Sequence, residues 1–216
     1  MEKLFLDTEF TGLHQYTSLA SIGIVSESGK EFYFENIDYK QPLDRDKDFF
    51  EKNVLSSMKF INNKNVVNEF IKSDYKGDFG KINYNVKDVN DNIQYNLDGV
   101  KDFMDKVEGF GTLKFIAKVL TEWINYHFDQ VKIWSDVYSY DWVLFNQMFG
   151  HAFDIPERVY YIPFDIATFF EFKGIDPDVN REAFASMQND NDIDKHNALW
   201  DAKVIKECYK ILELTY

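Results

Sequence analysis

Two acidic residues interrupt an apolar segment near the amino end of the chain. The stretch LFLDTEFTGL, residues 4–13, is rich in Leu and Phe as a buried strand would be, and it carries carboxylates at Asp7 and Glu9. Side chains at positions i and i+2 of a strand point to the same face, so the two carboxyl groups lie a few ångströms apart and repel each other. A fold that buries this strand must therefore bring a cation to that face. A metal ion is the simplest candidate.

The first 37 residues predict three strands in succession. Residues 3–10 form the first, and residues 18–37 contain two more, joined by a turn at Glu27–Lys30. The turn holds Ser28 and Gly29, which interrupt the apolar pattern as turn residues do. Strands joined by short turns pair antiparallel, so we expect the chain to begin as a three-stranded meander.

The second half of the chain alternates predicted helices with predicted strands. In order, these are a helix at 111–128, a short buried strand at 131–135, a helix at 139–150 that ends at Gly150, a strand leading into a short helix at 160–170, and a long amphipathic helix at 197–214. Apolar residues recur at helical spacing in the long helices. With the meander, this order predicts an α/β fold in which helices flank a mixed β-sheet.

The segment at about 44–105 lies between these two parts and is rich in Asn, Asp and Lys. Its short apolar clusters have only weak periodicity. Two interpretations stay open: an insertion of loops and short helices that shapes a substrate groove, or a solvated, partly mobile excursion. The length of 216 residues favours one domain, spanning 1–216, that carries this insertion.

The formal net charge of −13 argues against a surface that grips nucleic acid through many phosphates. It does not exclude a nuclease, because carboxylates that hold divalent cations are neutralised in the working site. No apolar run approaches the roughly 20 residues of a membrane span, and the amino end is charged. The single cysteine, Cys208, lies on an apolar helix face and is expected in the core. These features predict a cytoplasmic protein with no membrane association.

Two further acids occupy apolar helix faces. Asp141 shares a stripe with Leu144 and Met148, and Asp201 shares one with Ile205. A carboxylate that faces the interior costs several kcal/mol unless it is paired, protonated or bound to metal. With the pair on the first strand, four acids point at the protein. Four carboxylates can hold two divalent ions, the arrangement that stabilises the attacking and leaving oxygens of phosphodiester hydrolysis.

His196 lies five positions before Asp201, at or just before the start of the last helix. Alone, it would be interpreted as a solvent-facing loop histidine. Beside the acids, it is placed to reach the same site, and an imidazole is the natural group to deprotonate a metal-bound water. We therefore predict that His196 is a general base.

Three motifs occur in order along the chain: DTEFTGL, YDWVLF and HNALWDA. They resemble the exonuclease motifs of the DEDDh 3′–5′ exonucleases, the superfamily of RNase T, oligoribonuclease and polymerase proofreading subunits. The wider pattern, over residues 4–36 and 110–213, is similar to a bacterial and phage subgroup described as 3′–5′ exoribonuclease-like. The resemblance implies an RNase H-like fold and two Mg²⁺ or Mn²⁺ ions held through four acids, with His196 as general base. These acids are Asp7, Glu9, Asp141 and Asp201.

The resemblance also implies where the terminal nucleotide lies. In the superfamily, residues of the first motif cradle it, which carries over to Thr8, Phe10 and Leu13. Phe10 would stack on a base, although packing against the sheet is an equally simple role for it. Glu9 and the backbone at Thr8 are candidates for a contact to the ribose 2′-hydroxyl, the group that distinguishes RNA from DNA.

Two other acids compete for roles in the site. Asp136 ends a predicted strand and is an alternative to Asp141 as the third acid of the set. Asp165 precedes a short helix and is a candidate to hold one of the metal-binding side chains in position.

The leading hypothesis is a metal-dependent 3′–5′ exonuclease that hydrolyses single-stranded RNA, or 3′ overhangs, by a two-metal mechanism. A DNA-directed 3′–5′ exonuclease and an RNase H-like endonuclease use similar acids. A third alternative is an inactive module that binds nucleic acid or a partner protein. The expected partner is a single-stranded nucleic acid with a free 3′ end, RNA in preference to DNA, and the resemblance suggests a homodimer.

Overall fold

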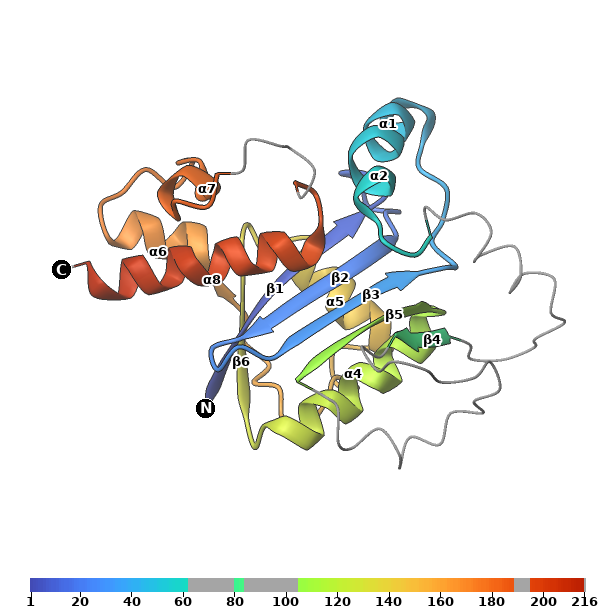
Figure 1. Cartoon of the computed structure of the whole chain (residues 1–216), viewed down its shortest axis with the longest axis horizontal. Coiled ribbons are helices and arrows are strands. Elements are labelled where there is room, and N and C mark those ends of the chain that lie inside the picture. The colour runs from blue at the N-terminus through green and yellow to red at the C-terminus, as the bar shows by residue number, and fades with distance from the viewer. Residues whose placement is uncertain (62–79, 84–104, 189–194, 216) are drawn as a thin grey trace, which may run out of the picture.

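A mixed seven-stranded sheet runs through the centre of the structure, a computed structural model that describes residues 1–61, 80–83, 105–188 and 195–215. The strand order is β4-β5-β3-β2-β1-β6-β7 (Figure 1). The strands are β1 (Glu2–Phe10), β2 (Leu19–Ser26), β3 (Glu31–Asn36), β4 (Gly80–Asn83), β5 (Lys106–Gly111), β6 (Val131–Ser135) and β7 (Phe164–Asp165). β1, β2 and β3 pair antiparallel, which confirms the meander, whereas β1 pairs with β6 and β3 with β5 in parallel. The predicted α/β fold, RNase H-like with a mixed sheet flanked by helices, is confirmed.

Helices cover both faces of the sheet. The helical elements are α1 (Asp44–Phe49), the π-helix η1 (Phe50–Val54), α2 (Leu55–Ser57), α4 (Leu113–His127), α5 (Asp141–Phe149), α6 (Ile166–Phe172), α7 (Arg181–Phe184) and α8 (Ala198–Leu214). α8 crosses the strands on the near face in Figure 1, beside α6 and α7, while α5 lies behind them. The α1–η1–α2 segment stands near the ends of β1 and β2. None of the helices in the described ranges is long and apolar enough to cross a membrane.

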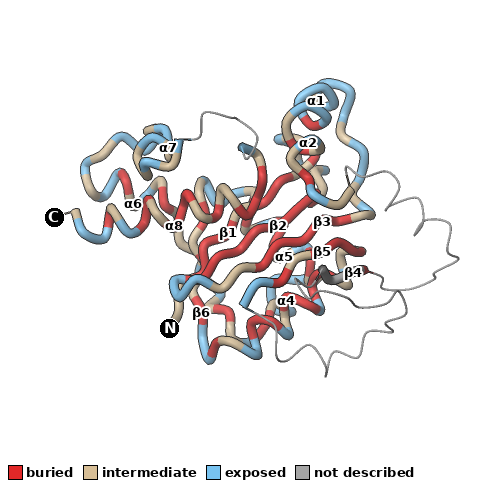
Figure 2. The backbone as a smooth tube through the Cα atoms, in the orientation of Figure 1, coloured by how far each residue is buried: buried red, intermediate tan, exposed pale blue. Residues whose placement is uncertain are grey.

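The alternation of side chains along β1 divides the apolar core into two layers. Leu4 and Leu6 pack in a cluster with residues of α4 and α5, whereas Phe5 packs in a second cluster with residues of α6 and α8. Side chains of a strand alternate between faces, so the odd-numbered residues of β1 face α8. Figure 2 shows the central strands almost wholly buried. Asp7 and Glu9 therefore lie on the α8 face, and Thr8 lies on the α5 face.

A glycine in β2 lets α8 approach the sheet closely. A Cβ atom built on Gly23 would lie 2.2 Å from both the carbonyl carbon of Ala198 and the amide nitrogen of Leu199. Gly23 is also the residue that pairs with Asp7 across the β1–β2 ladder. The first turn of α8 therefore rests directly beside Asp7.

Most elements follow the sequence prediction. The helix at 139–150 ends at Gly150, whose φ of 85° gives the left-handed C-cap that glycine favours, and Cys208 is fully buried as expected. β4, β5 and α7 were not predicted. Of the middle segment, the beginning forms α1, η1 and α2 and a part near 80 forms β4, while 62–79 and 84–104 lie outside the described residues. A single domain over 1–216 therefore stays a prediction.

Candidate active site

Three of the predicted acids meet where β1 passes under the start of α8. Carboxylate oxygens of Asp7, Glu9 and Asp201 all lie within 4.8 Å of one another. Asp7 and Glu9 share the α8 face of β1, and Asp201 lies in the first turn of α8, where its backbone N–H donates to the carbonyl of Asn197 over 3.0 Å. β1, which carries Asp7 and Glu9, and α8 are far apart in the sequence, and the close approach at Gly23 brings them together.

The environment of this acidic triad disfavours its negative charge. Burial raises the pKa of Asp7 and of Glu9 well above their usual values, and repulsion from Asp141 and Asp201 raises both further. Burial also raises the pKa of Asp201 to about 7, while a hydrogen bond from the backbone of His196 acts in the opposite direction. A divalent cation would remove this repulsion. The donors are all carboxylate oxygens, which suit hard cations such as Mg²⁺ and Mn²⁺.

Asp141, the fourth predicted acid, is not one of these three and is bonded to Thr8 of β1. It is the first residue of α5 and is only 5% exposed. Its Oδ1 accepts hydrogen bonds from the backbone N–H of Thr8 at 3.1 Å and from the hydroxyl of Thr8 at 2.5 Å. Burial raises the pKa of Asp141 to about 7 although both bonds from Thr8 lower it. Asp141 thus acts on Asp7 by charge, from a position that Thr8 holds.

His196 lies beside the triad, just before the N-cap residue Asn197 of α8. With Asp7 and Asp201 it lines a cavity of about 230 Å³. Its backbone φ of 63° is in the left-handed region, which is uncommon for a residue other than glycine. The imidazole meets the ring of Phe49 edge to face, with ring centroids 5.3 Å apart and an interplanar angle of 81°. The histidine and two of the acids therefore share one cavity.

The three residues predicted to cradle a nucleotide lie in different environments. The side chain of Thr8 is buried against Asp141, so it supports an acid rather than facing solvent. Phe10 stacks on Tyr140, with ring centroids 5.1 Å apart at 16°, and packs at the edge of the core. Leu13 is 75% exposed. Of the three, Leu13 is the one whose side chain is open to a ligand over most of its surface.

The two competing acids are held by other protein groups. Both oxygens of Asp136 accept hydrogen bonds from the guanidinium of Arg181, each at 2.9 Å. Asp165 caps α6 by accepting the backbone N–H of Thr168 at 2.6 Å, and its second oxygen accepts that of Tyr138 at 3.1 Å. Asp165 is therefore a helix cap. The choice of Asp141 over Asp136 as the third acid stays a prediction.

The cavity is also lined by polar residues that sequence reasoning missed, namely Asn180, Arg181, Glu182 and Lys195. Asp136, one of the two competing acids, lines it as well. Three of them belong to or adjoin α7, a helix of four residues with no periodicity to reveal it. Lys195 is next to His196 in the sequence, and this position was the one signal that could have identified a lining residue of the cavity.

A family model described as the 3′–5′ exoribonuclease Rv2179c-like domain matches residues 2–212. A search of curated proteins finds no match. The matched range runs from β1 into α8 and contains all four acids and His196. It also spans residues 44–105. The expectation that the resemblance covers only residues 4–36 and 110–213 was therefore wrong.

Proposed function

The chain belongs to the family of Rv2179c-like 3′–5′ exoribonuclease domains, and from this premise we propose that it degrades single-stranded RNA from a free 3′ end with the help of two divalent metal ions. The family makes the chain a hydrolytic exonuclease that acts on RNA. The preference for single strands, the number of metals and the roles of individual residues are the proposal. The observation that carries it is the acidic triad, two of whose members, Asp7 and Asp201, line one cavity with His196.

Metal binding is assigned to the four acids. Asp7, Glu9 and Asp201 offer oxygens close enough to share a cation, and Asp141 adds negative charge beside them. Mg²⁺ or Mn²⁺ ions bound there would supply the positive charge that activates a water and stabilises the departing 3′ oxygen. The protein keeps the acids in place beforehand, through the strand, the close contact at Gly23 and the bonds from Thr8.

Proton transfer is assigned to His196. A general base must lie beside the water that it deprotonates, and His196 lines the same cavity as Asp7 and Asp201. In this role a ring nitrogen of the neutral imidazole accepts a proton from the attacking water. The hydroxide equivalent then displaces the 3′ oxygen of the preceding nucleotide, and a nucleoside 5′-monophosphate leaves.

Substrate binding is assigned to the end of β1 and the loop after it. The stacked rings of Phe10 and Tyr140 and the exposed side chain of Leu13 offer an apolar edge for the terminal nucleotide. The backbone N–H of Thr8 already donates to Asp141, so Glu9 remains the candidate for a contact to the 2′-hydroxyl. The net charge of −13 favours a short bound length, since few phosphates can be neutralised.

The test uses RNA and DNA oligonucleotides of one sequence, labelled at the 5′ end, in Mg²⁺, in Mn²⁺ and in EDTA. We expect a ladder of shortened RNA products that needs metal and is blocked by a 3′-phosphate. Equal or faster digestion of DNA would support the DNA-directed alternative, and cutting of a circular RNA would support an endonuclease. Binding of RNA without turnover in either metal would support the alternative of an inactive binding module. The homodimer and the cytoplasmic location remain predictions.

A further inference from the structure

Residues 44–61, called the arm below, contact the start of α8 next to the site. The arm comprises α1, η1, α2 and the four residues that follow, and it stands near the ends of β1 and β2 (Figure 1). Its own core is small: Phe50, Val54 and Met58 are buried together with Ala20 of β2. Phe49, the last residue of α1, is not part of this core and is 55% exposed. Its ring contact with His196 is therefore not explained by packing of the arm.

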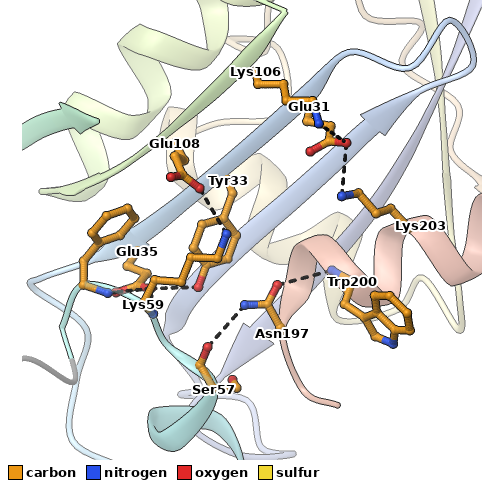
Figure 3. A network of polar contacts seen from close by, with 11 residues as sticks. Glu31, Tyr33, Glu35, Ser57, Lys59, Lys106, Glu108, Asn197, Trp200 and Lys203 are labelled. Atoms are coloured by element: carbon orange, nitrogen blue, oxygen red, sulfur yellow. Dashed lines mark hydrogen bonds and ion pairs between the residues drawn. The ribbon is translucent and has the colours of Figure 1, made fainter. Parts of the chain in front are cut away.

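Ser57, at the end of α2, joins the arm to the backbone of the same histidine. Its hydroxyl donates to the carbonyl of His196, and its own carbonyl accepts from the side-chain amide of Asn197 at 3.2 Å. The amide oxygen of Asn197 in turn caps α8 by accepting the backbone N–H of Trp200 at 3.3 Å (Figure 3). The arm thus holds both residues that lead into α8.

Glu35 of β3 fixes the other end of the arm to the sheet. Its carboxylate is fully buried and accepts three successive backbone N–H groups: that of Lys59 at 2.5 Å, that of Phe60 at 3.0 Å and that of Ile61 at 2.7 Å. The hydroxyl of Tyr33 donates to it as well, at 2.8 Å (Figure 3). A carboxylate with this many donors holds the backbone firmly, because breaking any one bond leaves a buried polar group unpaired.

We infer that Phe49 and Ser57 are positioning residues for the general base: Phe49 holds the imidazole of His196, and Ser57 holds the backbone that carries it. A left-handed residue other than glycine keeps its conformation only where its surroundings determine it, and these two contacts help to do so for His196, together with the hydrogen bond from its backbone to Asp201. The edge-to-face contact restricts rotation of the imidazole. The inference rests on the proposed function, since it assigns a purpose to the position of the base.

The test compares Phe49→Ala, Phe49→Tyr and Ser57→Ala with a control on a distant surface. Phe172→Ala is the control, because Phe172 is a terminal helix residue like Phe49 and is 83% exposed on α6. Steady-state kcat and KM are measured on single-stranded RNA. Histidine ring NMR of isotope-labelled protein is recorded in parallel, and His196→Ala identifies the signal of His196 among the four histidines.

We expect Phe49→Ala and Ser57→Ala to lower kcat about tenfold, as a displaced catalytic group does, with KM within about twofold of wild type. The signal of His196 should shift or broaden in both variants and stay unchanged in Phe172→Ala. Phe49→Tyr, which keeps the ring edge, should retain activity. In a His196→Ala background, Phe49→Ala should have no further effect on kcat.

Two results would overturn the inference. An unchanged His196 signal in Phe49→Ala and Ser57→Ala would do so whether or not the protein cleaves RNA. The second result is that Phe49→Ala raises KM at constant kcat and does so by the same factor in the His196→Ala background. Phe49 would then be a contact of the RNA and not a positioning residue. Failure of the proposed function is seen separately, as wild-type protein that does not shorten RNA in either metal.

Discussion

At the scale of single residues, the four acids differ in what surrounds them. Asp141 has two donors from Thr8, so its charge is partly compensated by the protein itself. Asp7, Glu9 and Asp201 face one another, and each carries a pKa raised first by burial and then by neighbouring acids. The triad is therefore unfavourable without a cation, and this shapes the residue-scale predictions.

Asp7→Asn should abolish turnover without harming the fold. The amide keeps the shape of the side chain, removes a metal charge and relieves repulsion within the triad. We expect RNA cleavage in Mg²⁺ to fall to background and the melting temperature of the metal-free protein to hold or rise. Cleavage assays and thermal melts in EDTA check both points. Cleavage close to the wild-type rate would refute the assignment of Asp7 as a ligand.

His196→Ala should lower kcat by about 10²–10⁴, the usual contribution of a general base, with a smaller effect on metal affinity. Because the base must be neutral to accept a proton, the rate of the wild-type enzyme should rise with pH as the imidazole loses its proton. The alanine variant should lack this rise. A variant whose pH–rate profile matches that of wild type would show that another group serves as the base.

Stability of the metal-free protein should fall as pH rises. The pKa of Asp201 is about 7 in the folded protein against 3.8 as an ordinary value, and those of Asp7 and Glu9 are also raised. The folded state thus holds protons more tightly than the unfolded state, so the stabilisation is complete below about pH 4 and is lost as pH rises through about 7. Thermal melts in EDTA between pH 5 and 8 would measure this decline. It should be smaller in Asp7→Asn and in Mn²⁺, and a flat profile for wild type in EDTA would contradict it.

At the scale of elements, the site depends on one close contact between β2 and α8. Gly23 faces the backbone at Ala198 and Leu199, so no side chain separates the strand from the helix there. The same contact sets the distance from Asp7 to Asp201 and to His196. The position of α8 over the sheet is therefore a condition for the triad.

Gly23→Ala should push α8 away from the sheet. A Cβ at 2.2 Å from two backbone atoms cannot be accommodated by rotating a side chain, so the helix must move, at a cost of about 1–3 kcal/mol. We expect lower thermal stability and a loss of cleavage greater than the loss of folded protein. Gly29→Ala is the matched control: it has open space but a φ of 94°, so it should destabilise the protein and leave kcat unchanged. Equal kcat in the two variants would count against this role of Gly23.

Elements with strong local periodicity could be predicted from the sequence, and elements defined by distant pairing could not. α4, α5 and α8 carry regular apolar stripes, and the strands of the meander are apolar and joined by clear turns. β5, with the sequence KVEGFG, contains two glycines and two charged residues, and it becomes a strand by pairing in parallel with β3. The inward orientation of Asp141 and Asp201 could be predicted from the same apolar stripes. The contacts of His196 with Phe49 and Ser57 join segments about 140 residues apart, and no local pattern indicates them.

At the scale of the whole molecule, charge limits how much RNA can be engaged. The excess of 37 acidic over 24 basic residues gives a net charge of −13 that opposes the binding of many phosphates, although Lys195 and Arg181 line the cavity. The guanidinium of Arg181 is already paired with Asp136. The protein is therefore expected to hold the end of a strand rather than its length.

Catalytic efficiency on RNA should depend only weakly on salt. If one or two phosphates are neutralised, kcat/KM should fall by about three- to sevenfold between 50 and 200 mM KCl, whereas proteins with many phosphate contacts lose orders of magnitude in affinity. Measuring kcat/KM on RNAs of several lengths over this range checks the prediction. A steep dependence that grows with RNA length would indicate an extended binding track.

The alternation along β1 ties the chemistry of the site to the apolar core. Leu4 and Leu6 must face α4 and α5, and Phe5 must face α8, so the faces of Asp7, Thr8 and Glu9 are decided by residues that never touch a substrate. Deleting Leu6 would leave Leu4 and Phe5 on their present faces and carry both carboxylates to the α5 face. The composition would hardly change, yet the acids of β1 and α8 would lie on opposite sides of the sheet. The side-chain register of β1 is thus as necessary to the acidic site as the acids themselves.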